Sequence, residues 1–320
     1  MGNSLEGKVA VVTGGGRGIG RGVSLLLASE GARVVVNDYG VAVDGSQPSD
    51  GPAAEVAEEI RAAGGQAVPN FDTVATMEGG DSMVKQALDA FGRLDIVVNV
   101  AGILRDRMVF NMTEQEWDDV VAVHLKGHFT TTKPASIIMR QQRSGRIITF
   151  TSGSGLRGSS GQANYGAAKA GIAGFTRVIA RDLGRYGVTC NSISPGAQTR
   201  MTATVPQSAR ETRAARGIAS GPAAAQVVER RPEQVAPMVA YLCTDDAWNI
   251  NGQIFAVSGG TVSLLYHPTP YRTIFKEGTW TIDELQSVVP AQLMSGVENP
   301  APPPADLEIP GRVRPAAAPA

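Results

Sequence analysis

The chain has 320 residues, of which 42% are hydrophobic and 18% are charged. That length and apolar content are enough to bury a full core in one large α/β domain. A net charge of −1 gives no electrostatic reason to bind nucleic acid or an anionic membrane surface. No apolar stretch has transmembrane length and no signal-peptide pattern opens the chain. We therefore expect a cytoplasmic protein with neither a membrane nor a nucleic-acid partner.

Cysteine and histidine are too few for the common structural sites. Cys190 lies in an apolar strand-like run and Cys243 in a helix-like run, so the two do not suggest a disulfide framework. His124, His128 and His267 are the only histidines of the sequence, which makes a histidine-based zinc centre improbable. We predict no metal site.

The first motif is a strand, a glycine-rich turn and a helix in immediate succession. Residues 8–13 are apolar, the turn 14–20 follows directly, and a helical pattern begins near Val23. Glycines let the backbone approach a pyrophosphate, and the N–H groups at a helix amino end attract its charge. The glycine spacing alone is a weak sign, but this order of elements is what dinucleotide binding needs. The predicted cofactor contacts are Gly14, Arg17, Gly18, Ile19 and Gly20.

The second strand, residues 32–37, ends at Asp38. A carboxylate at this place accepts hydrogen bonds from the adenosine ribose and repels a 2′-phosphate, which favours NAD over NADP. One alternative is that Asp38 caps the next helix. Arg17 could instead pair with a 2′-phosphate, which is a minor sign against NAD.

A stretch rich in Gly, Asp, Ser and Pro, residues 39–52, is predicted to be a long surface loop. A helix at 53–63 and a third strand at 66–70 follow it. Beyond that strand, Asp72 is placed to bind the adenine amino group, with Val74 against the ring. Capping of the next helix by Asp72 or Thr73 is an equally simple alternative.

Two more strand ends complete the predicted cofactor cleft. The strand at 94–99 ends in Asn99-Val100-Ala101-Gly102, where Asn99 can tie neighbouring strand ends and the small residues leave room. The strand at 188–193 leads to Pro195-Gly196-Ala197-Gln198-Thr199, where Thr199 can bond the nicotinamide carboxamide. The cofactor-binding residues predicted here are Asn99, Ala101, Gly102, Pro195, Gly196 and Thr199.

The predicted catalytic residues are Ser152, Tyr165 and Lys169. Tyr165 and Lys169 are four residues apart and share one helix face, while Ser152 ends the apolar strand at 146–151. A phenol with a pKa of about 10 is a poor base at neutral pH, but a nearby ammonium stabilises the phenolate. The trio therefore suits removal of a proton from an alcohol while a hydride leaves the same carbon. The same Tyr–Lys spacing is also common on solvated helices, so the nucleotide-binding motif gives the pattern its weight.

Strands that alternate with helices predict an α/β fold, a Rossmann-type doubly wound parallel sheet that forms a single domain with an extended C-terminal tail. The domain spans residues 1–266, with a mobile substrate lid at about 205–231. Residues 251–257 are predicted to be its last strand. The extension at 267–320 is Pro/Ala-rich at its end and contains one short capped helix at 281–289.

These motifs resemble the short-chain dehydrogenase/reductase family over residues 5–262. By resemblance, Tyr165 is the general base, Lys169 lowers its pKa and holds the ribose, and Ser152 binds the substrate oxygen. Most of the family has Asn at the position of His124, on a long helix opened by a capping box at 113–116. His124 is thus a fourth catalytic candidate, which either replaces that Asn or leaves its water to the backbone. The resemblance is carried by residues 13–20 and 99–102, by Ser152, Tyr165 and Lys169, and by residues 195–199.

A closer resemblance lies in residues 36–38, 101–107, 123–127 and 199–202. They are similar to the (3R)-hydroxyacyl-CoA dehydrogenase unit of the peroxisomal multifunctional enzyme and to related bacterial hydroxyacyl-CoA and hydroxysteroid dehydrogenases. The similarity implies NAD-dependent oxidation of a secondary alcohol to a ketone, with a small-molecule acyl-CoA or steroid substrate. It also implies a homodimer or homotetramer paired through the helices that carry His124 and Tyr165.

Three other functions stay open from sequence. A hydroxysteroid dehydrogenase would use the same trio on a free sterol alcohol. A dinucleotide-binding sensor would bind the cofactor without turnover. An NADPH-dependent biosynthetic reductase is disfavoured by Asp38.

Overall fold

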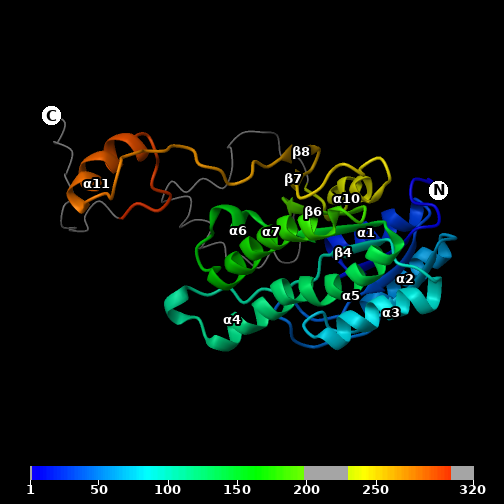
Figure 1. The fold of residues 1–320 in the computed structure, drawn as a ribbon. Coiled ribbons are helices and arrows are strands. Elements are labelled where there is room, and N and C mark those ends of the chain that lie inside the picture. Colours follow the sequence, from blue (N-terminus) through cyan, green and yellow to red (C-terminus); the bar gives the residue numbers. More distant parts are fainter. Residues whose placement is uncertain (1, 198–229, 304–320) are drawn as a thin grey trace. The chain divides into compact units, whose positions relative to one another are not determined.

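The computed structural model describes residues 2–197 and 230–303 (Figure 1). Within these residues, an eight-stranded sheet has the order β3-β2-β1-β4-β5-β6-β7-β8. Neighbouring strands are parallel except β7 and β8. The predicted Rossmann-type doubly wound sheet is therefore confirmed. The strands are β1 (Val9–Thr13), β2 (Arg33–Asn37), β3 (Gln66–Asn70), β4 (Ile96–Asn99), β5 (Gly145–Phe150), β6 (Val188–Pro195), β7 (Ile254–Ser258) and β8 (Thr261–Leu264).

Helices cover both faces of this sheet (Figure 1). Alternate residues of β1 enter opposite cores: Ala10 and Val12 pack in one, Val9 and Val11 in the other. Because both faces are buried, the strands are continuous apolar runs in the sequence. One face carries α1 (Gly18–Ser29), α2 (Gly51–Ala62) and α10 (Ala236–Cys243), and the other carries α3 (Met77–Phe91), α5 (Gly127–Gln142) and α7 (Ala163–Gly184).

The helix that carries His124 is continuous but not uniform. It begins as α4 (Glu114–Val121), passes through a π-helical turn (Ala122–Lys126) and continues as α5. The predicted capping box is present, since the Thr113 hydroxyl accepts from the Glu116 N–H and the Glu116 carboxylate accepts from the Thr113 N–H. Short helices at Val109–Asn111, α6 (Gly153–Arg157) and Pro232–Val235 complete this part of the fold.

One expectation and two alternatives from sequence are wrong. β7 is not the last strand, because β8 returns beside it in the antiparallel direction. Neither Asp72 nor Thr73 caps α3, since Thr76 occupies the N-cap and its hydroxyl accepts from the Gly79 N–H. Asp38 does not cap α2, whose N-cap position is Asp50.

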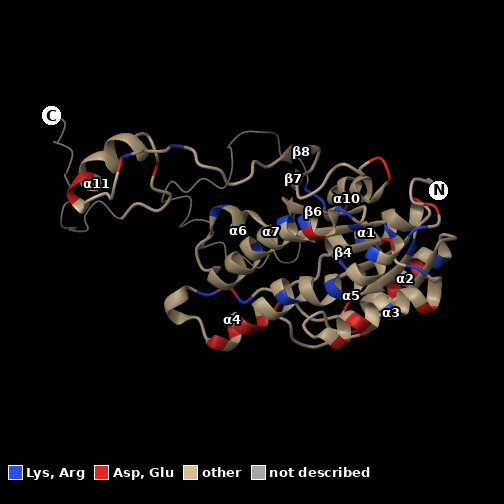
Figure 2. Ribbon diagram, viewed as in Figure 1, with Lys and Arg blue, Asp and Glu red and all other residues tan. Residues whose placement is uncertain are grey.

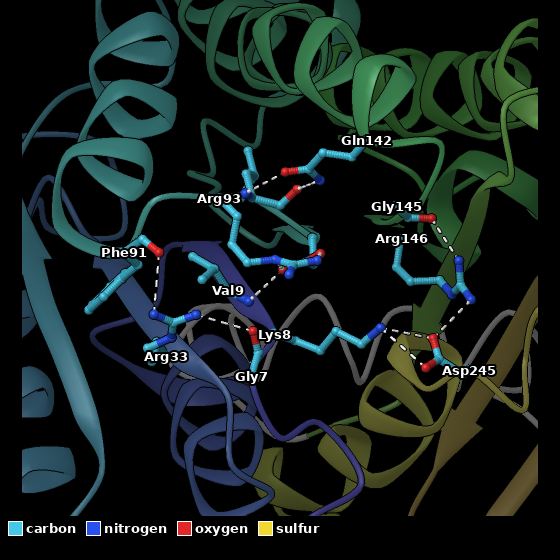
Figure 3. A network of polar contacts seen from close by, with 12 residues as sticks. Gly7, Lys8, Val9, Arg33, Phe91, Arg93, Gln142, Gly145, Arg146 and Asp245 are labelled. Atoms are coloured by element: carbon cyan, nitrogen blue, oxygen red, sulfur yellow. Dashed lines mark hydrogen bonds and ion pairs between the residues drawn. The ribbon is translucent and has the colours of Figure 1, made fainter.

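A network of polar contacts ties together the amino ends of the strands (Figure 3). Lys8 and Arg146, next to the starts of β1 and β5, both face the Asp245 carboxylate, at 3.0 Å from Nζ and 3.6 Å from Nη2. Arg33, the first residue of β2, donates to two backbone carbonyls. These contacts hold the amino ends of the strands, whereas sheets of this kind bind ligands at the carboxyl ends.

By its internal contacts the chain divides into two units, Met1–Arg210 with Ala224–Tyr266, and Glu211–Ala223 with His267–Ala320. In the second unit, none of the described residues 267–303 is buried. They form α11 (Ile282–Val288), with a Thr281–Glu284 capping box, and a π-helical turn (Val289–Leu293). The short capped helix predicted at 281–289 is confirmed.

Candidate active site

The carboxyl ends of the strands surround a cavity of about 1050 Å³. It opens between β1 and β4, where the strand order reverses and where sheets of this kind bind ligands. The structure brings most of the predicted site residues to its walls. These are Gly14, Arg17, Gly18, Ile19, Asp38, Asp72, Val74, Ala101, Gly102, His124, Ser152, Tyr165, Lys169 and Pro195.

The turn after β1 is shaped for close approach to a ligand. Gly14 has a φ of +63°, and a Cβ there would lie 2.8 Å from the Cα of Ala101. Gly20 does not line the cavity, but a Cβ on it would lie 2.0 Å from the Gly14 carbonyl oxygen. Its role is to let α1 start directly against the turn. Arg17, at the N-cap of α1, makes no capping hydrogen bond with its side chain, so the N–H groups of the first turn suit a pyrophosphate.

Asp38 is held rigidly where β2 ends. Its Oδ2 accepts from the Gly16 N–H at 3.0 Å and its Oδ1 from the Gly40 N–H at 2.8 Å. Each carboxylate oxygen can accept a further hydrogen bond, as ribose hydroxyls would require. Arg17 Nη1 donates to the Val41 carbonyl at 3.0 Å, which directs this guanidinium to the loop after β2.

The loop after β2 contributes to the cavity, which the sequence does not predict. Val41, Ala42, Val43 and Gly45 line it, and the Leu104 N–H donates to the Val43 carbonyl at 2.9 Å. In the sequence, Val41 and Val43 within this otherwise polar, glycine-rich loop were the indication that it packs beside a ligand site.

Beyond β3, the Asp72 carboxylate is already engaged by protein groups. It accepts from the Ser82 hydroxyl at 2.6 Å and from Asn70 Nδ2 at 2.9 Å. Val74 is buried, and its carbonyl accepts from the Thr130 hydroxyl at 2.6 Å. Both residues stand at the predicted adenine end of the cavity.

Asn99 and Gly196 do not line the cavity. Asn99 Oδ1 accepts from the Thr131 hydroxyl at 2.7 Å, so its side chain ties β4 to α5 and not to a neighbouring strand end. Thr13 makes the link between strand ends, since its Oγ1 accepts from the N–H groups of Val100 and Ala101. Thr199 and residues 205–229 of the lid predicted at about 205–231 lie outside the described residues.

The three predicted catalytic side chains share one wall of the cavity. Ser152 follows β5 as the N-cap of α6, and its Oγ accepts from the Ser154 N–H at 3.2 Å. Tyr165 and Lys169 lie in the first two turns of α7. Lys169 Nζ donates to the Phe150 carbonyl at 2.7 Å and lies 5.6 Å from the Tyr165 ring centroid.

Burial shifts the pKa values of Tyr165 and Lys169, the two ionisable members of this trio. It raises the pKa of the Tyr165 phenol; a hydrogen bond with Ser152 acts in the opposite direction, and the Asp106 carboxylate adds to the rise. Burial also lowers the pKa of the Lys169 ammonium to about 7. The sequence leads us to expect that Lys169 depresses the pKa of Tyr165. The net pKa of Tyr165 is nonetheless raised, because loss of hydration disfavours the charged form of each group.

His124 lies in the π-helical turn with its ring edge against Tyr165, at a centroid distance of 5.0 Å. Its Nε2 is 2.8 Å from the Ile103 carbonyl oxygen, whereas its buried Nδ1 has no hydrogen-bond partner. Burial, reinforced by Lys169, lowers the pKa of His124 well below 6.5, which keeps the ring neutral. A Cβ on Gly102 would lie 2.3 Å from His124 Cε1, so that glycine makes room for the ring.

Two side chains near the cavity are not predicted from sequence. Arg105 lines the cavity and pairs with Asp119 at 3.2 Å, on the acidic surface of α4 that Figure 2 shows. His128 is buried one helical turn beyond His124. The spacing of four residues between the two histidines was the available signal, because it places both on one helix face.

A family model described as short chain dehydrogenase matches residues 8–210. The chain belongs to the short-chain dehydrogenase/reductase family. The resemblance drawn from the motifs is thus confirmed, and the protein is an enzyme of an oxidoreductase family. Members with this Rossmann fold typically bind a nicotinamide dinucleotide.

Three similar proteins refine the comparison. Hydroxyacyl-CoA dehydrogenase ChsB1 of Mycobacterium tuberculosis is 42% identical over 294 residues, which cover 89% of this chain and 88% of that protein. Peroxisomal multifunctional enzyme type 2 of Mus musculus is 41% identical over 262 residues, 82% of this chain but only 33% of that enzyme. The crystal structure of a short chain dehydrogenase from Mycobacterium avium matches with a TM-score of 0.78 and 43% identity, and covers 94% of this chain and 98% of that one.

In residues 2–197 and 230–303, no cluster of three or more His, Cys, Asp or Glu side chains is placed to hold a metal ion. None of the helices in this part of the chain combines the length and the apolar character needed to cross a membrane. Cys190 and Cys243 are both buried as free thiols.

Proposed function

We propose that this enzyme is an NAD-dependent dehydrogenase that oxidises the secondary alcohol of a 3-hydroxyacyl-CoA to a ketone. The observation that carries the proposal is one cavity shared by the glycine turn, Asp38 and the Ser152–Tyr165–Lys169 trio. The names of the similar hydroxyacyl-CoA dehydrogenase and of the peroxisomal multifunctional enzyme support the substrate class.

The roles of the residues follow from their positions. Bound NAD would accept a hydride from the hydroxyl-bearing carbon. Tyr165 takes the hydroxyl proton, and Ser152, which hydrogen-bonds to the phenol, holds the same substrate oxygen. Lys169 stabilises charge on the phenol while the Phe150 carbonyl fixes its ammonium. The orphan Nδ1 of His124 is available to a water or a ligand group beside Tyr165.

For the cofactor, the turn after β1 would hold the pyrophosphate and Asp38 the adenosine ribose. Asp72 and Val74 stand where adenine would lie. Ala101, Gly102 and Pro195 would line the nicotinamide end, close to Lys169.

A substrate panel tests the reaction. The purified enzyme is assayed for NADH formation with 3-hydroxyacyl-CoA esters of several chain lengths, a free sterol alcohol and a steroid CoA thioester. We expect turnover with the thioesters, and a loss of about 10²–10⁴-fold in Tyr165→Phe with NAD binding retained. Preference for the free sterol alcohol would favour a hydroxysteroid dehydrogenase. Binding without turnover, unchanged in Tyr165→Phe, would favour a sensor.

Asp38 provides a separate test of the cofactor. Hydrogen bonds to a charged group contribute about 1.5–3 kcal/mol, so Asp38→Ser is expected to weaken NAD binding at least about tenfold. The same substitution removes the repulsion of a 2′-phosphate and should improve NADP binding. Tighter binding of NADPH than of NADH by the unaltered enzyme would show the assignment to be wrong and favour a biosynthetic reductase.

We further propose that the enzyme forms a homodimer or homotetramer through α5 and α7. Phe129 and Ile137 on α5 and Val178 on α7 are large apolar side chains that are 45%, 46% and 55% exposed. Such residues clustered on neighbouring helices are typical of a subunit interface.

A further inference from the structure

His128 is a buried side chain to which the catalytic roles above give no part. Its ring lies between two backbone groups that belong to different parts of the active site. Nδ1 is 2.6 Å from the His124 carbonyl oxygen, and Nε2 is 3.3 Å from the Phe150 nitrogen. The ring therefore bridges the π-helical turn and the end of β5.

These two contacts fix the protonation of the ring. A carbonyl oxygen can only accept, so Nδ1 carries the proton, and a backbone N–H can only donate, so Nε2 is unprotonated. The ring is thus neutral, with a single tautomer. Burial, reinforced by Lys169, agrees with this because it lowers the pKa of His128 to about 3.

The Phe150 N–H needs this partner because the pairing of β5 with β4 ends before Phe150. The Thr151 N–H donates to Ile193 of β6, so alternation along the strand directs the Phe150 N–H toward β4. The ladder between β4 and β5 ends at Val98 and Ile148. His128 Nε2 takes the place that a further β4 carbonyl would have had.

Both ends of the bridge lead to catalytic side chains. Phe150 presents its carbonyl to the Lys169 ammonium at 2.7 Å and precedes Ser152 by two residues. On the other side, the π-helical turn places the His124 ring against Tyr165. The spacing between these two groups depends on the ring that connects their backbones.

We propose that His128 is a positioning residue that fixes the end of β5, and with it the Lys169 ammonium and Ser152, relative to the π-helical turn that carries His124. It does not line the cavity. Its role in the reaction rests on the proposed function, whereas its tautomer does not.

Two isosteric variants separate the two contacts. Gln can place Oε1 near the position of Nε2 and accept from the Phe150 N–H, whereas Asn can place Nδ2 near the position of Nδ1 and donate to His124. His128→Phe keeps the volume and loses both contacts. Gln142→Met is the matched control, because Gln142 lies on the same helix and also bonds a backbone N–H and a backbone carbonyl, both of Leu94, far along α5 from His128.

Kinetics with a 3-hydroxyacyl-CoA and NAD give the first readout. Since small misplacements of catalytic groups cost up to about 10²-fold, we expect His128→Phe to lower kcat about 10–100-fold with little change in the KM for NAD. Gln should restore most of kcat, Asn should restore less, and Gln142→Met should keep the wild-type value. The proposal is overturned if His128→Phe keeps kcat within about threefold, if the control loses as much, or if Asn restores at least as much as Gln. The comparison of Gln with Asn still decides if His128→Phe does not fold.

The second readout needs no substrate. Nitrogen NMR of the enzyme labelled at histidine should show His128 with a protonated Nδ1 and an unprotonated Nε2 at pH 7. A charged ring or the opposite tautomer would overturn the inference. If the wild-type enzyme turns over no hydroxyacyl-CoA, the proposed function fails and this measurement alone decides whether the bridge exists.

Discussion

At the scale of single residues, the catalytic wall contains two ionisable groups in a space that disfavours charge on both. The Tyr165 phenol has its pKa raised by burial, and the Lys169 ammonium has its pKa lowered by burial to about 7. The Lys169 ammonium and the Tyr165 phenolate would stabilise one another, but burial destabilises either charge when the other is absent. The pair is therefore best described as coupled.

The pH dependence of alcohol oxidation should report this burial. Because burial raises the pKa of the Tyr165 phenol, the phenolate fraction is small at neutral pH, and the rate should rise from pH 7 to 9. Ser152 lowers that pKa through its hydrogen bond, so Ser152→Ala should move the rise to higher pH. The measurement is kcat against pH for both enzymes. A flat wild-type profile over this range, or a rise moved to lower pH by the substitution, would contradict the argument.

Lys169 should also make stability depend on pH. Its pKa is about 7 in the folded protein but 10.5 for the free side chain, so between these values the unfolded chain binds the extra proton. Stability therefore rises with pH in this window, by at most about 1.4 kcal/mol per pH unit. Lys169→Met should remove that slope. Urea unfolding from pH 7 to 8.5 at one protein concentration checks this.

The difference in the pH dependence of stability between the wild-type enzyme and Lys169→Met reports the contribution of Lys169. Burial raises the pKa of the Cys243 thiol to about 12, which acts against stability at high pH, but it does so equally in both proteins. Equal slopes of the unfolding free energy against pH in the wild-type enzyme and Lys169→Met would mean that the Lys169 ammonium is hydrated in the folded state.

At the scale of elements, the π-helical turn and the segment after β4 are shaped for one another. Gly102 leaves room for the His124 ring, since a Cβ there would lie 2.3 Å from Cε1. Gly102→Ala should therefore displace the ring from Tyr165, destabilise the fold by about 1–3 kcal/mol and lower kcat. In a His124→Ala background the same substitution should have little further effect.

A double-mutant cycle of unfolding free energies and kcat measures this coupling. Gly260→Ala serves as the matched control, because an added Cβ at Gly260 meets no atom within 4 Å. Additive effects of Gly102→Ala and His124→Ala would show that the two residues do not share this space.

Sequence predicts those parts of the site that depend on local order. The apolar strands, the glycine turn and the helix with Tyr165 and Lys169 are each determined within a few residues, and the structure has them where they are predicted. Contacts made by tertiary packing are not accessible in this way. Thr76 is the cap of α3 only because the chain turns once more after β3, and His128 matters only because β4 ends before β5 does.

At the scale of the whole molecule, the two ends of the sheet have different parts. Polar contacts among Lys8, Arg146 and Asp245 hold the amino ends, while the carboxyl ends surround the cavity. The loop after β2 and the π-helical turn, which lies within a continuous helix, both line this cavity. Specificity is therefore expected to lie in these two segments, and stability in the sheet and its two layers of helices.

The remaining large feature of this unit is the apolar surface of α5 and α7, which we propose as the subunit interface. In a twofold interface the same patch of both subunits meets, so residue i contacts residue j and j contacts i; carboxylates introduced at two positions of the patch therefore meet like charges. Ile137→Glu with Val178→Glu should convert the wild-type dimer or tetramer into a smaller species that still binds NAD, since neither residue lines the cavity. Tyr241→Glu is the matched control, because Tyr241 is 45% exposed on α10, over the other face of the sheet. Analytical ultracentrifugation at several concentrations gives the masses. A monomeric wild-type enzyme, or a double variant that keeps the wild-type mass, would show that these helices do not pair.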